Sequence, residues 1–113
     1  MIDSAMRERL ERIKARDAEI TELMMSPEVL GDHKLMAKYG KEQSGLQQTV
    51  QAFAQYEAAE RFYAEAKEMY ETESESELKE MAEMEMAENS EKIEKLTEDL
   101  RVLLIPRDPS DDF

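Results

Sequence analysis

The chain has 113 residues, of which 28 are acidic and 15 basic, and its formal net charge is −13. This length supports one domain with one core. The negative field repels phosphate backbones, so nucleic-acid binding by the molecule as a whole is disfavoured. The absence of cysteine excludes disulfides and thiolate metal sites.

The sequence contains no stretch that fits a membrane span or a secretion signal. No apolar run approaches the roughly 18 to 20 residues that cross a bilayer, and the first residues, Met-Ile-Asp-Ser, lack a basic-then-apolar pattern. We therefore expect a soluble, cytoplasmic protein that has no membrane partner.

A first helix is predicted over about residues 3–25. Its apolar residues recur at intervals of three and four, with only Asp17 interrupting them: Met6, Leu10, Ile13, Ile20 and Met24. The following residues, 26–32, contain Pro27, which resists continuing a helix, and Gly31, which suits a left-handed stop. They predict a connector with at most one helical turn.

A second, longer helix is predicted over 34–72. The same spacing continues along it: Leu35, Tyr39, Leu46, Val50, Phe53, Tyr56, Ala59, Tyr63, Ala66 and Tyr70. Gly40 and Gly45 lie inside this pattern, and each costs on the order of 1 kcal/mol relative to alanine. The first turns of this helix are therefore expected to bend or fray.

A third helix is predicted over 75–105. Ser74 followed by Glu77 matches a capping box at its start, and Pro106 ends it. Its apolar positions form the third stripe: Leu78, Met81, Ala82, Met86, Ile93, Leu96, Leu100 and Leu103.

These elements predict an all-α fold, an antiparallel three-helix bundle with coiled-coil-like stripes and a long helical hairpin. Each stripe is narrow, so no helix is stable alone. Residues 1–105 form the predicted domain. The second and third helices outreach the first, which leaves a two-helix hairpin tip at residues 66–82 with a core of Ala66, Met69, Met81 and Ala82.

The hairpin tip is strongly acidic. Between Glu68 and Glu91 there are ten glutamates and one basic residue, Lys79. A solvated hairpin is the more common meaning of such a run. The functional alternative is a docking surface for a basic partner, with Glu71, Glu73 and Glu77 as its candidate residues.

Other features favour structural roles. Arg9, Arg12 and Arg16 share one face of the first helix, where ion pairs with acidic neighbours are expected. Methionines 81, 84 and 86 fit gap filling better than adaptive partner contact. No catalytic constellation, cofactor loop, zinc spacing or small-molecule site is recognisable, so we expect neither an enzyme nor a cofactor.

The end of the chain carries a specific resemblance. Residues 103–112, Leu-Leu-Ile-Pro-Arg-Asp-Pro-Ser-Asp-Asp, resemble the junction after the N-terminal helical domain of bacterial class I peptide chain release factors. Residues 25–32 and 38–42 are similar to that family's first connector and the start of its long helix, and residues 81–83 to part of its third helix. The Pro-basic-Asp-Pro ending is more similar to the release factor 1 branch than to the UGA-reading branch.

The resemblance implies a translation termination factor domain that docks at the stalk base of the large ribosomal subunit, on a ribosomal protein and ribosomal RNA. It also implies contact with the rest of the factor, beginning with a linker at 106–113. The family's Gly-Gly-Gln and Pro-x-Thr tripeptides do not occur in these 113 residues. The alternative function is a free-standing acidic coiled coil that self-associates.

Overall fold

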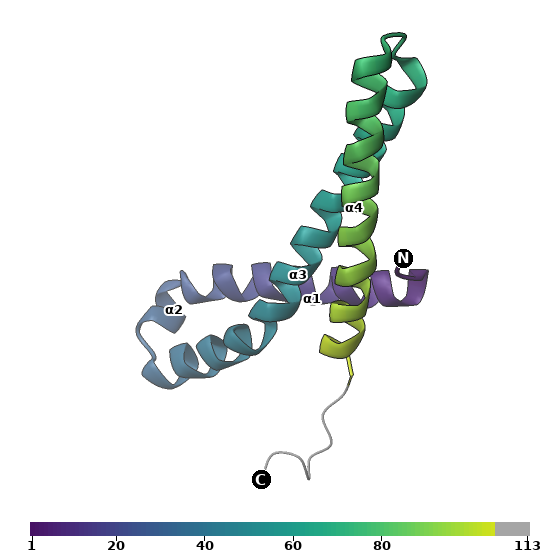
Figure 1. Cartoon of the computed structure of the whole chain (residues 1–113). Coiled ribbons are helices and arrows are strands. Elements are labelled where there is room, and N and C mark those ends of the chain that lie inside the picture. Colours follow the sequence, from purple (N-terminus) through teal and green to yellow (C-terminus); the bar gives the residue numbers. More distant parts are fainter. Residues whose placement is uncertain (106–113) are drawn as a thin grey trace. The chain divides into compact units, whose positions relative to one another are not determined.

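The computed structural model describes residues 1–105, and all its regular secondary structure in that range is helical (Figure 1). Four helices follow one another: α1 (Ser4–Met24), α2 (Pro27–Leu30), α3 (His33–Thr72) and α4 (Ser76–Leu103). The all-α class, the three main helices and the single turn in the connector are therefore confirmed. The predicted linker, 106–113, lies outside the described residues.

The chain divides into two compact units. One unit comprises residues 2–51, with α1, α2 and the first half of α3. The other comprises Met1 and the chain from residue 52 onward, with the second half of α3 and α4. The long helix α3 thus contributes to both cores.

Side-chain oxygens explain where the first helices begin. Asp3 caps α1 by accepting a hydrogen bond from the Met6 backbone N–H at 2.8 Å. Ser26 Oγ donates to the Leu23 carbonyl at 2.8 Å and accepts from the Val29 N–H at 3.4 Å, so it joins the end of α1 to the start of α2. Asp32 Oδ1 accepts from two N–H groups at the start of α3, at 3.0 and 3.2 Å.

Two sequence expectations at helix ends are wrong. Gly31 does not adopt a left-handed conformation, since its φ is −85° and its ψ 0°. The Ser74 capping box does not form, because α4 begins at Ser76 with Glu75 as its N-cap residue and no side-chain capping bond. α3 also runs without interruption through Gly40 and Gly45, despite their low helix propensity.

In the unit of residues 2–51, α1 and α3 run antiparallel. Gln47 donates to the Asp17 carboxylate at 2.9 Å, and Gln43 donates to the Thr21 hydroxyl at 2.8 Å. Asp17 therefore interrupts the apolar stripe without lacking a partner. Gly40 lies about one turn before Gln43 on α3 and lets the Met24 side chain approach the helix. The Met24 methyl lies 3.9 Å from the position that a Cβ on residue 40 would take.

Arg16 connects α1 to α3 through ionic hydrogen bonds. It donates to the Glu42 carboxylate through Nε at 2.6 Å and through Nη2 at 2.9 Å, and it also pairs with Glu19. Its guanidinium lies over the Tyr39 ring, 5.9 Å from the centroid. The hydrogen bonds from Arg16 hold the pKa of Glu42 below its ordinary value, while those to Glu42 and then Glu19 raise the pKa of Arg16. The predicted intramolecular role of Arg16 is confirmed.

In the second unit, α3 and α4 run side by side in opposite directions to a tight turn (Figure 1). Most of its buried apolar residues follow the predicted stripes of both helices: Phe53, Tyr56, Ala59, Ala66, Ala82, Ile93, Leu96 and Leu100. Leu104, which the prediction did not include, is buried just after α4. Thr97 is buried among these positions, and its hydroxyl is satisfied by donating to the Ile93 carbonyl at 2.6 Å.

Candidate docking surface

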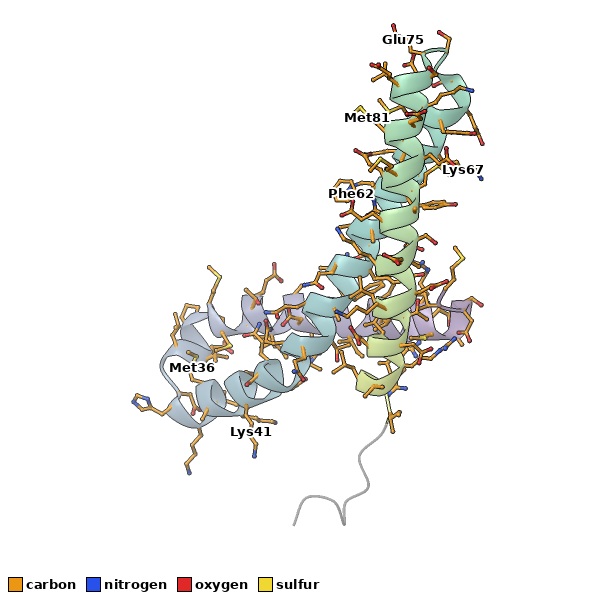
Figure 2. The ribbon with its side chains drawn as sticks, viewed as in Figure 1. Met36, Lys41, Phe62, Lys67, Glu75 and Met81 are labelled. Atoms are coloured by element: carbon orange, nitrogen blue, oxygen red, sulfur yellow. The ribbon has the colours of Figure 1, made fainter. Side chains whose placement is uncertain are left out.

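The hairpin tip is closed by residues 73–75, between the end of α3 and the start of α4. Glu73 holds this turn with its own carboxylate, whose Oε1 accepts from the backbone N–H groups of Ser74 at 3.1 Å and Glu75 at 3.3 Å. One of these donors, the Ser74 N–H, is the group that the Glu77 side chain would have bonded in the predicted capping box. Figure 2 labels Glu75 at this end of the hairpin.

The three candidate partner-binding residues all lie at this end but are not equivalent. Glu71 is exposed in the last turn of α3, and Glu77 is exposed in the first turn of α4. Glu73 is half-buried and engaged with the turn backbone. Glu71 and Glu77 can therefore meet a partner, whereas Glu73 has a structural role that the sequence did not reveal.

Charge is divided unevenly along the chain. Residues 2–51 contain eight basic and nine acidic residues, whereas residues 52–113 contain seven basic and nineteen acidic residues. Lys79, the single basic residue between Glu68 and Glu91, lies over the Tyr70 ring, 5.1 Å from its centroid. The excess negative charge of the protein therefore lies almost entirely in residues 52–113.

The expected apolar core of the tip is only half correct. Ala66 and Ala82 are buried, but Met69 and Met81 are 43% and 57% exposed. Met84 is 72% exposed, so gap filling is the wrong interpretation for Met81 and Met84. Small alanines on facing helices permit close approach, and the long side chains beside them remain outside the contact.

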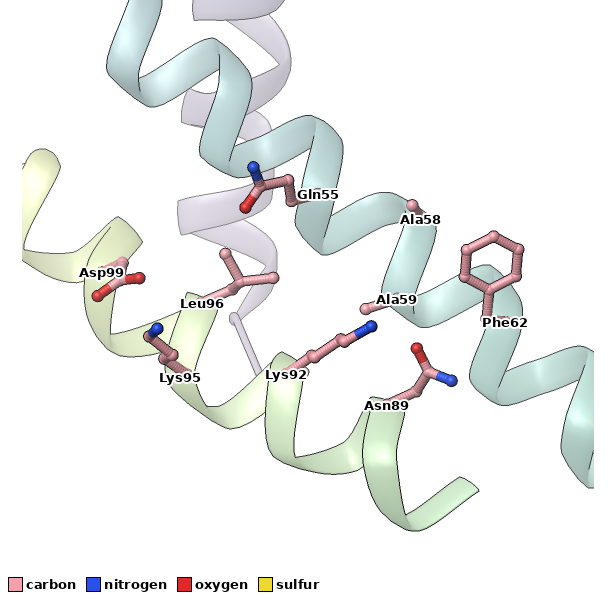
Figure 3. A pocket seen from close by; sticks show the side chains of 9 residues that line it. All are labelled: Gln55, Ala58, Ala59, Phe62, Asn89, Lys92, Lys95, Leu96 and Asp99. Carbon is pink, nitrogen blue, oxygen red and sulfur yellow. The ribbon is translucent and has the colours of Figure 1, made fainter. Parts of the chain in front are cut away.

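A pocket of about 350 Å³ opens on one flank of the hairpin, between α3 and α4 (Figure 3). We call it the flank pocket, and its lining combines small apolar, aromatic, amide and charged side chains: Gln55, Ala58, Ala59, Phe62, Asn89, Lys92, Lys95, Leu96 and Asp99. Its volume lies at the low end of the range for ligand sites.

Asn89 is the most unusual residue of the flank pocket. It is 7% exposed, and its amide nitrogen donates to the Glu85 carbonyl at 2.9 Å. Its Oδ1 is buried and has no hydrogen-bond partner among residues 1–105. Buried polar atoms nearly always have a partner, so this acceptor calls for an explanation.

Phe62, the aromatic residue that lines the flank pocket, is exposed, unlike the buried aromatic residues of the core. Phe62 is 47% exposed. In Figure 2, Phe62 and Met81 project from the same side of the hairpin. The flank therefore presents exposed apolar side chains from both helices.

The flank pocket was not expected from the sequence, although two features of the sequence point to it. Asn89 occupies a stripe position between Ala82 and Ile93, where an apolar residue is the norm. Phe62 lies next to the stripe residue Tyr63 instead of on the stripe itself. A polar residue on an apolar stripe and an aromatic residue beside one together mark a candidate surface site.

The described residues provide no arrangement for metal binding, and none of their helices could cross a membrane. Among residues 1–105, no group of three or more histidine, aspartate or glutamate side chains is placed to hold a metal ion. Within that same range, no helix is both long enough and apolar enough for a transmembrane segment.

Comparison with known proteins places the chain in a family. Residues 13–113 match the PCRF domain. Peptide chain release factor 1 of Bacillus licheniformis is 44% identical over 107 residues, that of Bacillus subtilis 42%, and that of Clostridioides difficile 36%. Each alignment covers 95% of this chain, which spans 30% of the length of each of these relatives. No solved structure matches the chain.

The resemblance inferred from residues 103–112 is therefore confirmed, and with it the release factor 1 branch. The match extends over α2, α3, α4 and most of α1. The chain belongs to the PCRF domain family of peptide chain release factors.

Proposed function

We propose that this chain is the ribosome-docking domain of a bacterial translation termination factor, acting in the cytoplasm as part of a longer release factor. The observation that carries the proposal is the family match over residues 13–113 together with 44% identity to a release factor 1. In this proposal, residues 1–105 form the docking domain and residues 106–113 begin a linker to the remainder of the factor.

The finer part of the proposal concerns the contact. We infer that the hairpin tip meets a basic ribosomal protein at the stalk base of the large subunit, beside ribosomal RNA. The charge division supports this, because nineteen acidic residues lie in 52–113. Such a surface accelerates encounter with a basic partner and selects it over acidic ones. Glu71 and Glu77 are the exposed contact residues, and Glu73 shapes the turn that presents them.

Catalysis is not assigned to this chain. Its 113 residues lack the Gly-Gly-Gln and Pro-x-Thr tripeptides that the family resemblance associates with peptide release and stop-codon reading. The proposed role is positioning, and chemistry belongs to other parts of a full-length factor. The match to the PCRF domain supports this function and lends no support to the self-associating coiled coil.

Charge reversal at the tip tests the contact. The double variant Glu71→Lys with Glu77→Lys should lower the association rate with ribosomes on the order of tenfold at low salt, and less at physiological salt. Stopped-flow binding of the labelled chain to 70S ribosomes measures this rate.

A matched control separates the tip from net charge. Glu8→Lys with Glu22→Lys makes the same change in charge at exposed positions of α1. This control variant should associate with ribosomes at nearly the wild-type rate. Equal losses in the two double variants, or no loss in either, would show that the tip is not the contact.

A further inference from the structure

We propose that the flank pocket binds a tryptophan or tyrosine side chain presented by a basic helix of a partner protein. This proposal is independent of ribosome docking, because it concerns the flank of the hairpin and not its tip. It rests on the shape of the pocket, on the unsatisfied acceptor inside it and on the charges around it.

The shape of the flank pocket fits a flat aromatic side chain. Ala58 and Ala59 on α3 and Leu96 on α4 provide small and apolar surfaces. Phe62 forms an exposed aromatic wall at one side (Figure 3). Aromatic rings pack favourably against such a wall in offset or edge-to-face arrangements, beyond the effect of the buried area alone.

The acceptor selects a side chain that carries a donor. Asn89 Oδ1 is buried and has no partner within residues 1–105, while an N–H of the same carboxamide donates to the Glu85 carbonyl. Figure 3 shows Lys92 extending across the pocket beside the Asn89 carboxamide. The Lys92 side chain is 57% exposed, and its ammonium lies 3.5 Å from the exposed Glu88 carboxylate, so only a weak surface ion pair holds it beside the pocket. An indole N–H or a phenol O–H then supplies the missing bond.

The cations at the rim favour an aromatic ring over a charged donor. One acidic residue, Asp99, lines the flank pocket, but two basic residues, Lys92 and Lys95, outnumber it. They repel an arginine or lysine side chain that enters it, but they attract the face of an aromatic ring. A tryptophan or tyrosine side chain is neutral, so Lys92 and Lys95 do not repel it, and its N–H or O–H group can donate to Asn89 Oδ1.

The surroundings of the pocket indicate the segment that carries this side chain. A third helix can pack into the groove between two antiparallel helices, and it then inserts the apolar side chains of one of its faces. Exposed Phe62 and Met81 extend the apolar surface along the same side of the hairpin. The acidic excess of residues 52–113 favours a basic helix, and the net charge of −13 opposes a second copy of the chain.

A peptide series tests the proposal on the 113-residue chain. The probe is a helical peptide of roughly 15 residues, composed of alanine and lysine with one central tryptophan. Because the chain contains no tryptophan, the fluorescence of the peptide reports binding directly. Twin peptides with phenylalanine or alanine at the centre are measured by competition at physiological salt.

The expected result is an order of affinities that depends on Asn89. The tryptophan peptide should bind about three- to tenfold more tightly than the phenylalanine peptide, and the alanine peptide should bind most weakly. Asn89→Leu should remove the difference between tryptophan and phenylalanine while leaving the difference between phenylalanine and alanine. If Asn89 had only a structural role, Asn89→Leu would leave the ratio of the tryptophan-peptide affinity to the phenylalanine-peptide affinity unchanged.

A second variant addresses the pocket without changing Asn89. Ala58→Leu fills the pocket and should weaken the tryptophan peptide about tenfold, whereas Ala64→Leu places the same change at an exposed position of α3 outside it. No saturable binding, equal binding of the three peptides, or equal effects of the two leucine variants would overturn the proposal. A concentration-dependent dimer abolished by Ala58→Leu would assign the pocket to a second copy and would also overturn it.

Discussion

Arg16 on α1 and Glu42 on α3 are joined by two hydrogen bonds, from Nε to Oε2 at 2.6 Å and from Nη2 to Oε1 at 2.9 Å. This two-pronged geometry matches the planar guanidinium to the carboxylate. Arg16 and Glu42 are each only 36% exposed, and the pair crosses from one helix to another. It therefore fixes the alignment of α1 against the first half of α3.

This pair gives the protein a pH-dependent contribution to stability. Arg16 lowers the pKa of Glu42 in the folded state below the ordinary 4.5. A carboxyl group with a lowered folded pKa stabilises the fold above its unfolded pKa, and this contribution disappears as the pH falls through the folded value.

We therefore expect Glu42→Gln to be less stable than the wild type at neutral pH. The difference should shrink below about pH 4.5 and vanish at more acidic pH. Urea unfolding followed by circular dichroism at several pH values measures it. Glu94→Gln, at an exposed position of α4, is the control. A difference that grew on acidification would contradict the assigned pairing.

Asn89→Leu should stabilise the isolated chain by about 1 kcal/mol, because it removes a buried acceptor that has no partner in the described part of the chain. Thermal unfolding measures the change. Thr97→Val is a matched comparison on α4, since the buried Thr97 hydroxyl already donates to the Ile93 carbonyl. It should give no gain. A loss of stability in Asn89→Leu would mean that Asn89 serves the fold itself.

Gly45→Ala should stabilise the chain by about 0.5–1 kcal/mol, because alanine loses less backbone freedom in a helix. Among the described residues 1–105, no atom outside the local backbone lies within 4 Å of the position that a Cβ at residue 45 would take, so the methyl group of alanine meets open space. Gly31→Ala is the contrasting change outside the helices, and it should give a smaller gain. Chemical denaturation of the two variants compares them. Destabilisation by Gly45→Ala would indicate that α3 is interrupted there in solution.

Leu100→Ala should destabilise the hairpin unit by about 2–5 kcal/mol, since the Leu100 side chain is fully buried and its truncation leaves a cavity. Val102→Ala, two residues further along α4, removes carbon atoms from a side chain that is 65% exposed. It should change stability little. Similar losses in both variants would place the core on a different face of α4.

The apolar stripes could be predicted from sequence because burial follows the helical period. Leu10, Ile20, Phe53 and Leu100 are buried as their spacing requires. The start of α4 could not be derived from spacing alone. Ser74 and Glu77 match a capping box, but the Glu73 carboxylate accepts from the Ser74 N–H that the Glu77 side chain would have bonded, and α4 begins at Ser76.

Exposure near the tip was also beyond the sequence pattern. Met81 and Tyr70 occupy stripe positions, yet both are exposed. Periodicity assigns a face but not the distance between two helices, and Ala66 and Ala82 bring no side-chain bulk to the contact. The flank pocket depends on the same spacing between helices. It could therefore be recognised only once α3 and α4 were placed side by side.

The most direct test of the central claim is equilibrium binding of the labelled 113-residue chain to purified ribosomal subunits. We predict saturable binding to 50S subunits that weakens as salt is raised, and no saturable binding to 30S subunits. Equal binding to the two subunits, or no binding to 50S subunits at low salt, would contradict the account.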